Sequence, residues 1–274
     1  KNFNCSQLND VKNALHIMRQ YDQALLFAMK AAALKPNDFS INYSIGHLYQ
    51  LLCVYGESIK YYRKAEKNAS NDDARGYINF SMGFLMDSMG YYQKALKFYA
   101  GYPKKENWIL FNNIAFVLIA LGQYKEAIQL IDKGLLLHAN QPNLLSNKAL
   151  ALFCLHQHHL IPNLLLIIKA SNSENINLPN AQIAANNIQG LLLFSEGKEA
   201  EAEQLFFEVL NGIDLDRQCR ILLMRGIGLR SVDAFEEALN CFDHILMLHT
   251  AHVPALLQKG HTYVSQANYS KAVE

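Results

Sequence analysis

The chain has 274 residues, of which 51 % are apolar and 18 % are charged, and its net charge is +1. No block or stripe of basic residues stands out in the sequence, so composition argues against a nucleic acid or an acidic membrane surface as the ligand. Apolar runs such as residues 114–121 are too short to span a bilayer, and we expect no membrane insertion. Because charged residues are fewer than usual, we expect some apolar surface to remain after the core is filled.

The cysteines are odd in number and scattered. There are five of them, and no two form a C-x-x-C pair. Free thiols in a reducing compartment are the simplest interpretation, so we expect a cytoplasmic protein. The chain opens on Lys1 and stops at Glu274 inside a repeat. We therefore treat it as a fragment, which leaves open whether a signal peptide precedes it.

A helical pattern recurs along the chain at spacings close to 34 residues. In chain order it reads "YDQALLFAMKAA" from Tyr21, "YGESIKYYRKA" from Tyr55, "YYQKALKFY" from Tyr91, "GQYKEAIQLIDKGL" from Gly122 and "AFEEALNCFDHIL" from Ala234. Apolar and small residues fall on one helical face in each copy. A period of about 34 residues indicates a stacked array of helical pairs. In such an array each unit contacts only its neighbours.

Small residues recur at two positions of this period. The units span 5–38, 39–72, 76–107, 108–141, 142–175, 183–216, 219–252 and the truncated 253–274. Positions 8 and 20 are each small in seven of the eight units, and position 17 is aromatic in six. Two antiparallel helices can cross closely only where neither carries a bulky side chain, and the aromatic residue can wedge between them.

The pattern resembles the tetratricopeptide repeat, a family of stacked helix–turn–helix units. The resemblance implies an all-α, right-handed superhelical solenoid that forms a single domain over residues 1–274. Inserts interrupt the frame at 73–75, 176–182 and 217–218, and the polar stretch 171–182 is the best candidate for a boundary between two sub-arrays. In the degenerate fifth unit we expect the second helix to start near Ile161, with Pro162 in its first turn. In the third unit, Gly101 to Pro103 implies that the second helix stops early.

The resemblance also implies a concave groove lined by the first helix of each unit. Carried onto this chain, the groove is a row of aromatic residues flanked by asparagines. The candidate partner-binding residues are Tyr43, His47, Tyr77, Phe80, Phe84, Asn112, Asn113, Phe116, Asn147, Phe153, Asn187 and Phe194. Exposed aromatics commonly dominate binding sites, and amides can hydrogen-bond a peptide backbone of any sequence.

We therefore expect a groove for an apolar or amphipathic protein or peptide segment, in which replacing Phe84 or Phe116 by alanine weakens binding and leaves the helices intact. The alternative is that some of these phenylalanines pack against the next unit or against the end of the chain. Family members that clamp acidic chaperone tails use lysine and arginine in three adjacent units. The first units here carry Asn9, Asn13 and Ser44 instead, so an acidic chaperone tail is not the expected ligand.

No catalytic constellation is recognisable, so we expect a protein that is not an enzyme and needs no cofactor. His156, His158 and His159 crowd one turn without a cysteine or carboxylate at suitable spacing, and we expect a solvated loop rather than a metal site. The expected function is a non-catalytic scaffold or chaperone-like adaptor. Two alternatives remain: the substrate-recognition arm of a larger enzyme, and an array that associates with itself as a homo-oligomer.

Overall fold

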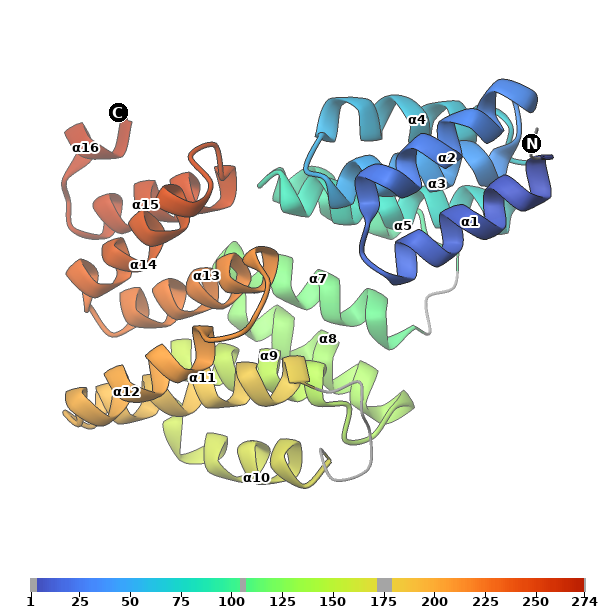
Figure 1. Cartoon of the computed structure of the whole chain (residues 1–274). Coiled ribbons are helices and arrows are strands. Elements are labelled where there is room, and N and C mark those ends of the chain that lie inside the picture. The colour runs from blue at the N-terminus through green and yellow to red at the C-terminus, as the bar shows by residue number, and fades with distance from the viewer. Residues whose placement is uncertain (1–3, 104–106, 172–178, 274) are drawn as a thin grey trace. The chain divides into compact units, whose positions relative to one another are not determined.

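The computed structural model of the chain describes residues 4–103, 107–171 and 179–273. In these residues the helices follow one another as antiparallel pairs (Figure 1), and this confirms the predicted all-α fold. The first three pairs are α1 (Cys5–Ile17) with α2 (Tyr21–Leu34), α3 (Phe39–Leu51) with α4 (Tyr55–Lys67), and α5 (Asp72–Ser88) with α6 (Tyr92–Ala100). The later pairs are α7 (Trp108–Ala120) with α8 (Tyr124–Leu137), α9 (Pro142–Cys154) with α10 (Ile161–Ser171), α11 (Pro179–Ser195) with α12 (Glu199–Leu210), α13 (Leu215–Ser231) with α14 (Phe235–Leu248), and α15 (Val253–Ser265) with α16 (Tyr269–Val273).

The chain divides into two compact units. Unit 1 is Lys1–Lys105 and contains α1 to α6, and unit 2 is Glu106–Glu274 and contains α7 to α16. The sequence favoured a boundary at 171–182, of which residues 172–178 lie outside the described residues. The helices on either side of that stretch, α10 and α11, pack together within unit 2, and α11 also packs on α9. That both units belong to one continuous array stays a prediction.

The turn inside each pair has one conformation throughout the described residues. Its second residue has a positive φ in all eight pairs, and these residues are Arg19, Cys53, Gly90, Gly122, His156, Gly197, Asp233 and Ala267. In seven pairs the turn has three residues, and in the fifth pair it runs into a short 3-10 helix, His158–Leu160. Many of the first helices of the pairs begin with a side-chain cap. Side chains of Asn4, Asp38, Asn71, Asn107 and Asp214 cap the helices that follow them.

Within the described residues the expected inserts are additional helix, and residues 176–178 of the second insert lie outside the described residues. Helices α5, α11 and α13 each have 17 residues, whereas the first helices of the other pairs have 13. Each long helix begins one turn before the unit boundary expected from the sequence, so residues 73–75, 179–182 and 217–218 are helical. The other two local expectations are confirmed, because α6 ends at Ala100 and α10 begins at Ile161.

In four of the helix pairs the close crossing depends on an aromatic ring that rests on a glycine, and these glycines are Gly46, Gly83, Gly190 and Gly226. A Cβ added to Gly83 would lie 2.5 Å from a ring carbon of Tyr99, and one added to Gly46 would lie 2.7 Å from the ring of Tyr62. Phe242 rests on Gly226 in the same way. The residue at position 20 crosses beside this contact, since the Ser58 hydroxyl donates to the Gly46 carbonyl at 2.8 Å. The glycine thus makes room for an aromatic side chain of the second helix, which the sequence analysis had not assigned.

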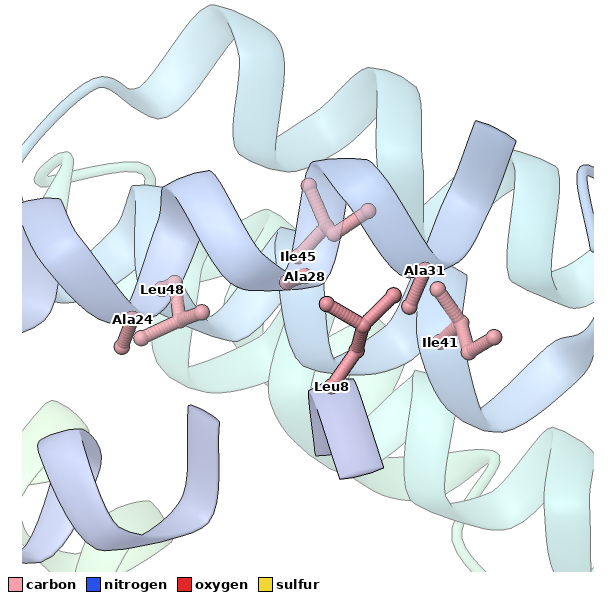
Figure 2. Packing of buried hydrophobic residues seen from close by; sticks show 7 residues of the cluster. All are labelled: Leu8, Ala24, Ala28, Ala31, Ile41, Ile45 and Leu48. Carbon is pink, nitrogen blue, oxygen red and sulfur yellow. The ribbon is translucent and has the colours of Figure 1, made fainter. Parts of the chain in front are cut away.

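An apolar core joins the first two pairs of unit 1. Figure 2 shows side chains of α1, α2 and α3 that meet in it: Leu8, Ala24, Ala28, Ala31, Ile41, Ile45 and Leu48. Alanines face the neighbouring helix along α2, whereas larger side chains come from α3. The small residues of one helix therefore accept the large residues of the next, which is how successive pairs stack.

The ring-on-glycine contact predicts that Gly83→Ala lowers the free energy of unfolding by about 1–3 kcal/mol, because the added methyl group would displace the Tyr99 ring. Urea unfolding followed by circular dichroism measures this. Gly56→Ala is the matched control, because a Cβ at Gly56 in α4 meets nothing within 4 Å. We expect its stability to be unchanged or raised by up to about 1 kcal/mol. Equal losses in the two variants would contradict the contact.

A histidine caps α15. His252 Nδ1 accepts a hydrogen bond from the Ala255 N–H at 3.2 Å, so the ring serves as an N-cap only while Nδ1 is unprotonated. Burial, together with the neighbouring His249, lowers the pKa of His252 to about 4. Unfolding would restore the ordinary pKa of about 6.5, so between pH 6.5 and pH 4 the unfolded chain binds more protons at this site.

We therefore predict that the contribution of His252 to stability is complete above about pH 6.5 and is lost as the pH falls towards 4. His252→Asn keeps a capping acceptor and removes the titration, so its melting temperature should fall less steeply over that range than that of the parent. His156→Asn, at an exposed turn position, is the control. The prediction fails if the two variants show the same pH slope.

Candidate partner-binding site

The first helices of the pairs in unit 2 pack closely against one another. Helix α9 contacts α7, α11 and α13, and α13 also contacts α15. The fully buried Gln258 of α15 joins both ends of this set. Its Nε2 donates to the Ala120 carbonyl at the end of α7 at 2.9 Å, and its Oε1 accepts from Arg230 of α13 at 2.7 Å. Helices far apart in sequence therefore meet on the inner side of unit 2.

Two phenylalanines expected to face the groove in unit 2 are instead inside the unit. Phe116 is 4 % exposed, and the Arg220 guanidinium lies 3.8 Å from the centre of its ring. Phe153 has no exposed surface and stacks on His158 at 4.6 Å between ring centres. These contacts correspond to the alternative in which the rings pack against other parts of the chain. Phe116→Ala would remove a buried ring and cost about 3–5 kcal/mol, so it does not leave folding unaffected as we expected from sequence.

The asparagines of α7 and α9 gather at a pocket of about 290 Å³ in unit 2. Its lining residues are Asn112, Asn113, Asn143, Ser146, Asn147, Ile183, Ala184, Arg217, Arg220, Ile221 and Met224. Asn147 Nδ2 donates to Asn112 Oδ1 at 2.9 Å, and Asn112 Nδ2 is 3.4 Å from Asn113 Oδ1. Three of the sequence-predicted residues therefore form a connected amide row along one wall. The volume lies near the lower end of the range for ligand pockets, enough for one or two side chains.

Two arginines of α13 give the opposite wall a positive charge. Arg217 is neutralised in part by Asp214, whose Oδ2 lies 3.4 Å from its Nε. Arg220 forms no ion pair among the side chains that the structure describes, and the Phe116 ring covers one face of its guanidinium. Stacking on an aromatic ring leaves the edge of a guanidinium free to donate hydrogen bonds. The pocket therefore offers amide donors and acceptors on one side and an unpaired cation on the other.

Asn187 and Phe194 belong to α11, outside this pocket. Asn187 is fully buried, and its Oδ1 accepts from Arg225 Nε at 3.0 Å. Arg225 also donates to the Phe206 carbonyl at 3.1 Å, and burial lowers its pKa to about 10. Asn187 therefore holds α13 to α11 inside the unit. Phe194 is partly exposed.

The five candidate residues of unit 1 lie on α3 and α5. The Tyr43 and Ser81 hydroxyls are 2.8 Å apart, which ties the two helices together. Phe80 packs at 5.5 Å from the Tyr102 ring and is partly exposed, as is Phe84. Tyr77 is the most open of the set, with 48 % of its surface exposed.

His47, also on α3, lies 5.5 Å from the His16 ring, and its pKa is lowered by burial and then by His16 and Lys12. The inner side of unit 1 is thus aromatic, and part of it is exposed.

No protein-family model matches the sequence, and no curated protein matches it. Solved structures do. A tetratricopeptide repeat protein from Parabacteroides merdae matches 98 % of this chain and 99 % of its own, with a TM-score of 0.62 at 14 % identity. The fold is that of the tetratricopeptide repeat. PilF of Pseudomonas aeruginosa matches 78 % of this chain and 95 % of its own (TM-score 0.58, 16 % identity). PilW, described as a type IV pilus biogenesis factor, matches 77 % and 94 % (TM-score 0.56, 16 % identity).

The tetratricopeptide frame explains why sequence reasoning found the asparagines and missed the arginines. Asn113 and Asn147 occupy the same position of successive units, and the structure places both in the pocket wall. Arg217 lies in a stretch that the frame treats as an insert, yet it belongs to the additional turn of α13. Arg220 lies within the first helix of its unit but was not among the candidate residues predicted for the groove. The position of Arg220 opposite the asparagines depends on how the first helices of unit 2 pack against one another. The sequence of a single repeat does not determine that packing.

Other kinds of site were sought in the residues described. No group of three or more His, Cys, Asp or Glu side chains in them could hold a metal ion. All five cysteines are free thiols, and burial raises the pKa of Cys154 to about 11 and that of Cys241 to about 11. A helix long and apolar enough to cross a membrane does not occur in the described parts of the chain.

The bridge formed by Gln258 predicts that Gln258→Leu lowers the free energy of unfolding by about 2–4 kcal/mol, because the Ala120 carbonyl and the Arg230 guanidinium lose a buried partner. Urea unfolding measures the change. Gln129→Leu, on the exposed side of α8, should alter stability by less than about 0.5 kcal/mol. A Gln258→Leu protein as stable as this control would show that the bridge does not hold unit 2 closed.

Proposed function

We propose that the protein is a non-catalytic scaffold that binds an amphipathic polypeptide segment, and that an acidic group of the segment enters the pocket of unit 2. The observation that carries this proposal is the unpaired Arg220 facing the amide row of Asn112, Asn113 and Asn147. Amides satisfy the donors and acceptors of a peptide backbone, whereas a guanidinium binds a carboxylate through paired hydrogen bonds. The tetratricopeptide fold supports a protein partner rather than a small substrate.

Unit 1 has, by itself, an aromatic surface that suits an apolar segment of a protein partner. Tyr77, Phe80 and Phe84 expose aromatic surface, whereas Phe116 and Phe153 of unit 2 are buried. Aromatic side chains with partly exposed rings are common anchors in protein interfaces. We therefore assign direct contact with a partner to the unit 1 aromatics and to the pocket residues. Phe116, Phe153 and Asn187 would position the site from within.

A peptide selection tests the acidic preference. Random peptides displayed on phage are selected against the immobilised full chain, and the selected sequences are then measured as synthetic peptides. We expect an aspartate, a glutamate or a free C-terminus to recur among them. Arg220→Gln should weaken their binding by about 1.5–3 kcal/mol, which is roughly a 10- to 150-fold rise in Kd, because it removes a charged hydrogen-bonding partner.

Lys133→Gln, an exposed position on α8, is the matched control for loss of one positive charge and should bind as the parent does. A Tyr77→Ala variant reports separately on the unit 1 face. Selected peptides that bind Arg220→Gln and the parent equally would overturn the role of the pocket. Failure to select any peptide against the parent would overturn the scaffold proposal itself.

A further inference from the structure

Helix α4, the outer helix of the second pair, carries basic side chains along one face. A shallow groove of about 470 Å³ runs along it, lined by Gly56, Ile59, Lys60, Arg63, Lys64 and Lys67. The sequence analysis found no basic stripe because Glu57 and Glu66 interrupt these residues in the linear order. Helical spacing of three and four residues brings the cations onto one side. The face is therefore basic although the whole chain is almost neutral.

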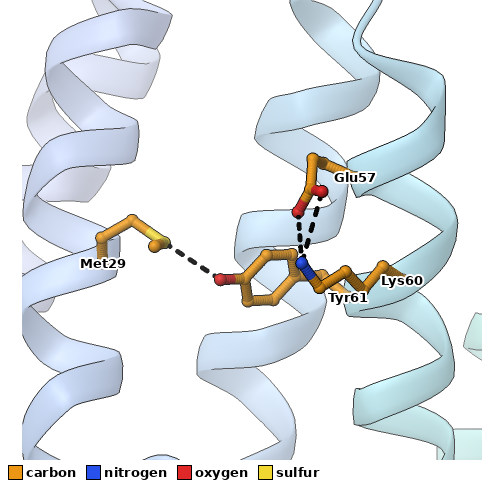
Figure 3. A network of polar contacts seen from close by, with 4 residues as sticks. All are labelled: Met29, Glu57, Lys60 and Tyr61. Carbon is orange, nitrogen blue, oxygen red and sulfur yellow. Dashed lines mark hydrogen bonds and ion pairs between the residues drawn. The ribbon is translucent and has the colours of Figure 1, made fainter.

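The cations of α4 are not equally available. Figure 3 shows Lys60 held by the Glu57 carboxylate, at 3.1 Å in the ion pair, with Tyr61 beside it donating to the Met29 sulfur at 3.4 Å. Arg63 and Lys67 are exposed and form no ion pair among the described side chains. With Ile59 they make a row at four-residue spacing: one apolar residue followed by two free cations.

Helix α12 carries the complementary row. Ala202, Phe206 and Val209 face the core of unit 2, and the exposed residues Glu199, Glu203 and Phe207 run along the flank of the helix beside that face. Phe207 is 70 % exposed, an unusual position for a large apolar ring. Its spacing from Glu203, and that of Glu203 from Glu199, is again four residues. In chain order, this row therefore has two anionic residues followed by one apolar residue.

The two rows match in one orientation. On two antiparallel helices, residues four apart advance about 6 Å on each, so three successive contacts stay in step. Phe207 would then lie over Ile59 and the open side of Gly56, Glu203 opposite Arg63, and Glu199 opposite Lys67. A parallel arrangement would set Phe207 against Lys67 and Glu199 against Ile59. The antiparallel orientation also aligns the helix dipoles favourably.

We propose that α4 of one copy of this chain docks against α12 of another copy in this register, an interaction beyond the proposed peptide-binding function. The surfaces differ on the two partners, so each bound copy still offers one free face, and copies add head to tail into chains or close into rings. The contact is small and carries exposed charges, so it is weak and salt-sensitive.

Sedimentation of the full chain over a range of concentrations at low ionic strength tests the proposal. The average mass of the parent should rise steadily with concentration and fall back towards the monomer when salt is added. The variants Arg63→Glu/Lys67→Glu and Glu199→Lys/Glu203→Lys should each weaken association by about tenfold or more, because attraction becomes repulsion at two sites. Circular dichroism checks that both variants remain helical.

Mixing the two variants is the decisive measurement. Each supplies charges that complement the other, so the mixture should recover association that neither shows alone. The variant that carries all four substitutions should associate with further copies of itself, because both of its charged rows are reversed. Lys133→Glu is the control for an unrelated charge reversal and should associate as the parent does.

A parent that stays monomeric at all concentrations and low salt would overturn the proposal, as would a mixture that fails to associate. Association lost only in the α4 variant would mean that α4 binds an acidic surface other than α12, which also overturns it. These readouts use mass alone and are independent of peptide binding at Arg220.

Discussion

The contact that sets the close crossing of four helix pairs is the one between an aromatic ring of the second helix and a glycine of the first. Tyr62 on Gly46, Tyr99 on Gly83 and Phe242 on Gly226 each let two backbones approach as closely as the ring thickness permits. The ring fills the space that a Cβ would otherwise occupy. The two helices of the pair are therefore held against sliding along each other. Successive pairs can then stack with alanine faces against larger side chains, as α2 stacks against α3.

The tight closure of unit 2 changes what its inner surface can do. The sequence suggested an open row of phenylalanines, yet Phe116 is covered by Arg220 and Phe153 by His158. The two phenylalanine rings are therefore part of the core of unit 2. The asparagine amides and the Arg220 guanidinium line the accessible pocket instead. The pocket of unit 2 therefore combines amides and guanidinium groups with smaller apolar side chains such as Ile183 and Met224, whereas unit 1 keeps exposed aromatic surface at Tyr77.

Much of the fold could be predicted because it is encoded locally and repeatedly. The period, the small residues at the crossing and the early stop at Gly101 are short-range signals, and the structure confirms the all-α fold of paired helices. The frame marked the inserts but not their structure, because a few extra residues before a helix can lengthen it as readily as they can form a loop. The site was only partly predictable. Asn112, Asn113 and Asn147 followed from the frame, but the opposition of Arg220 across the pocket is a long-range property.

The uniform turn inside each pair leaves room for improving the protein. Only three of its eight left-handed positions are glycine; Arg19, Cys53, His156, Asp233 and Ala267 occupy the others with a side chain. A residue with a Cβ in that conformation is strained by roughly 1–2 kcal/mol, partly offset by the smaller chain entropy that it loses on folding. Relieving the strain at these five positions should therefore raise the free energy of unfolding. Glycine or asparagine at these helix–helix turns would relieve the strain without changing any residue of the crossing contacts or of the pocket lining.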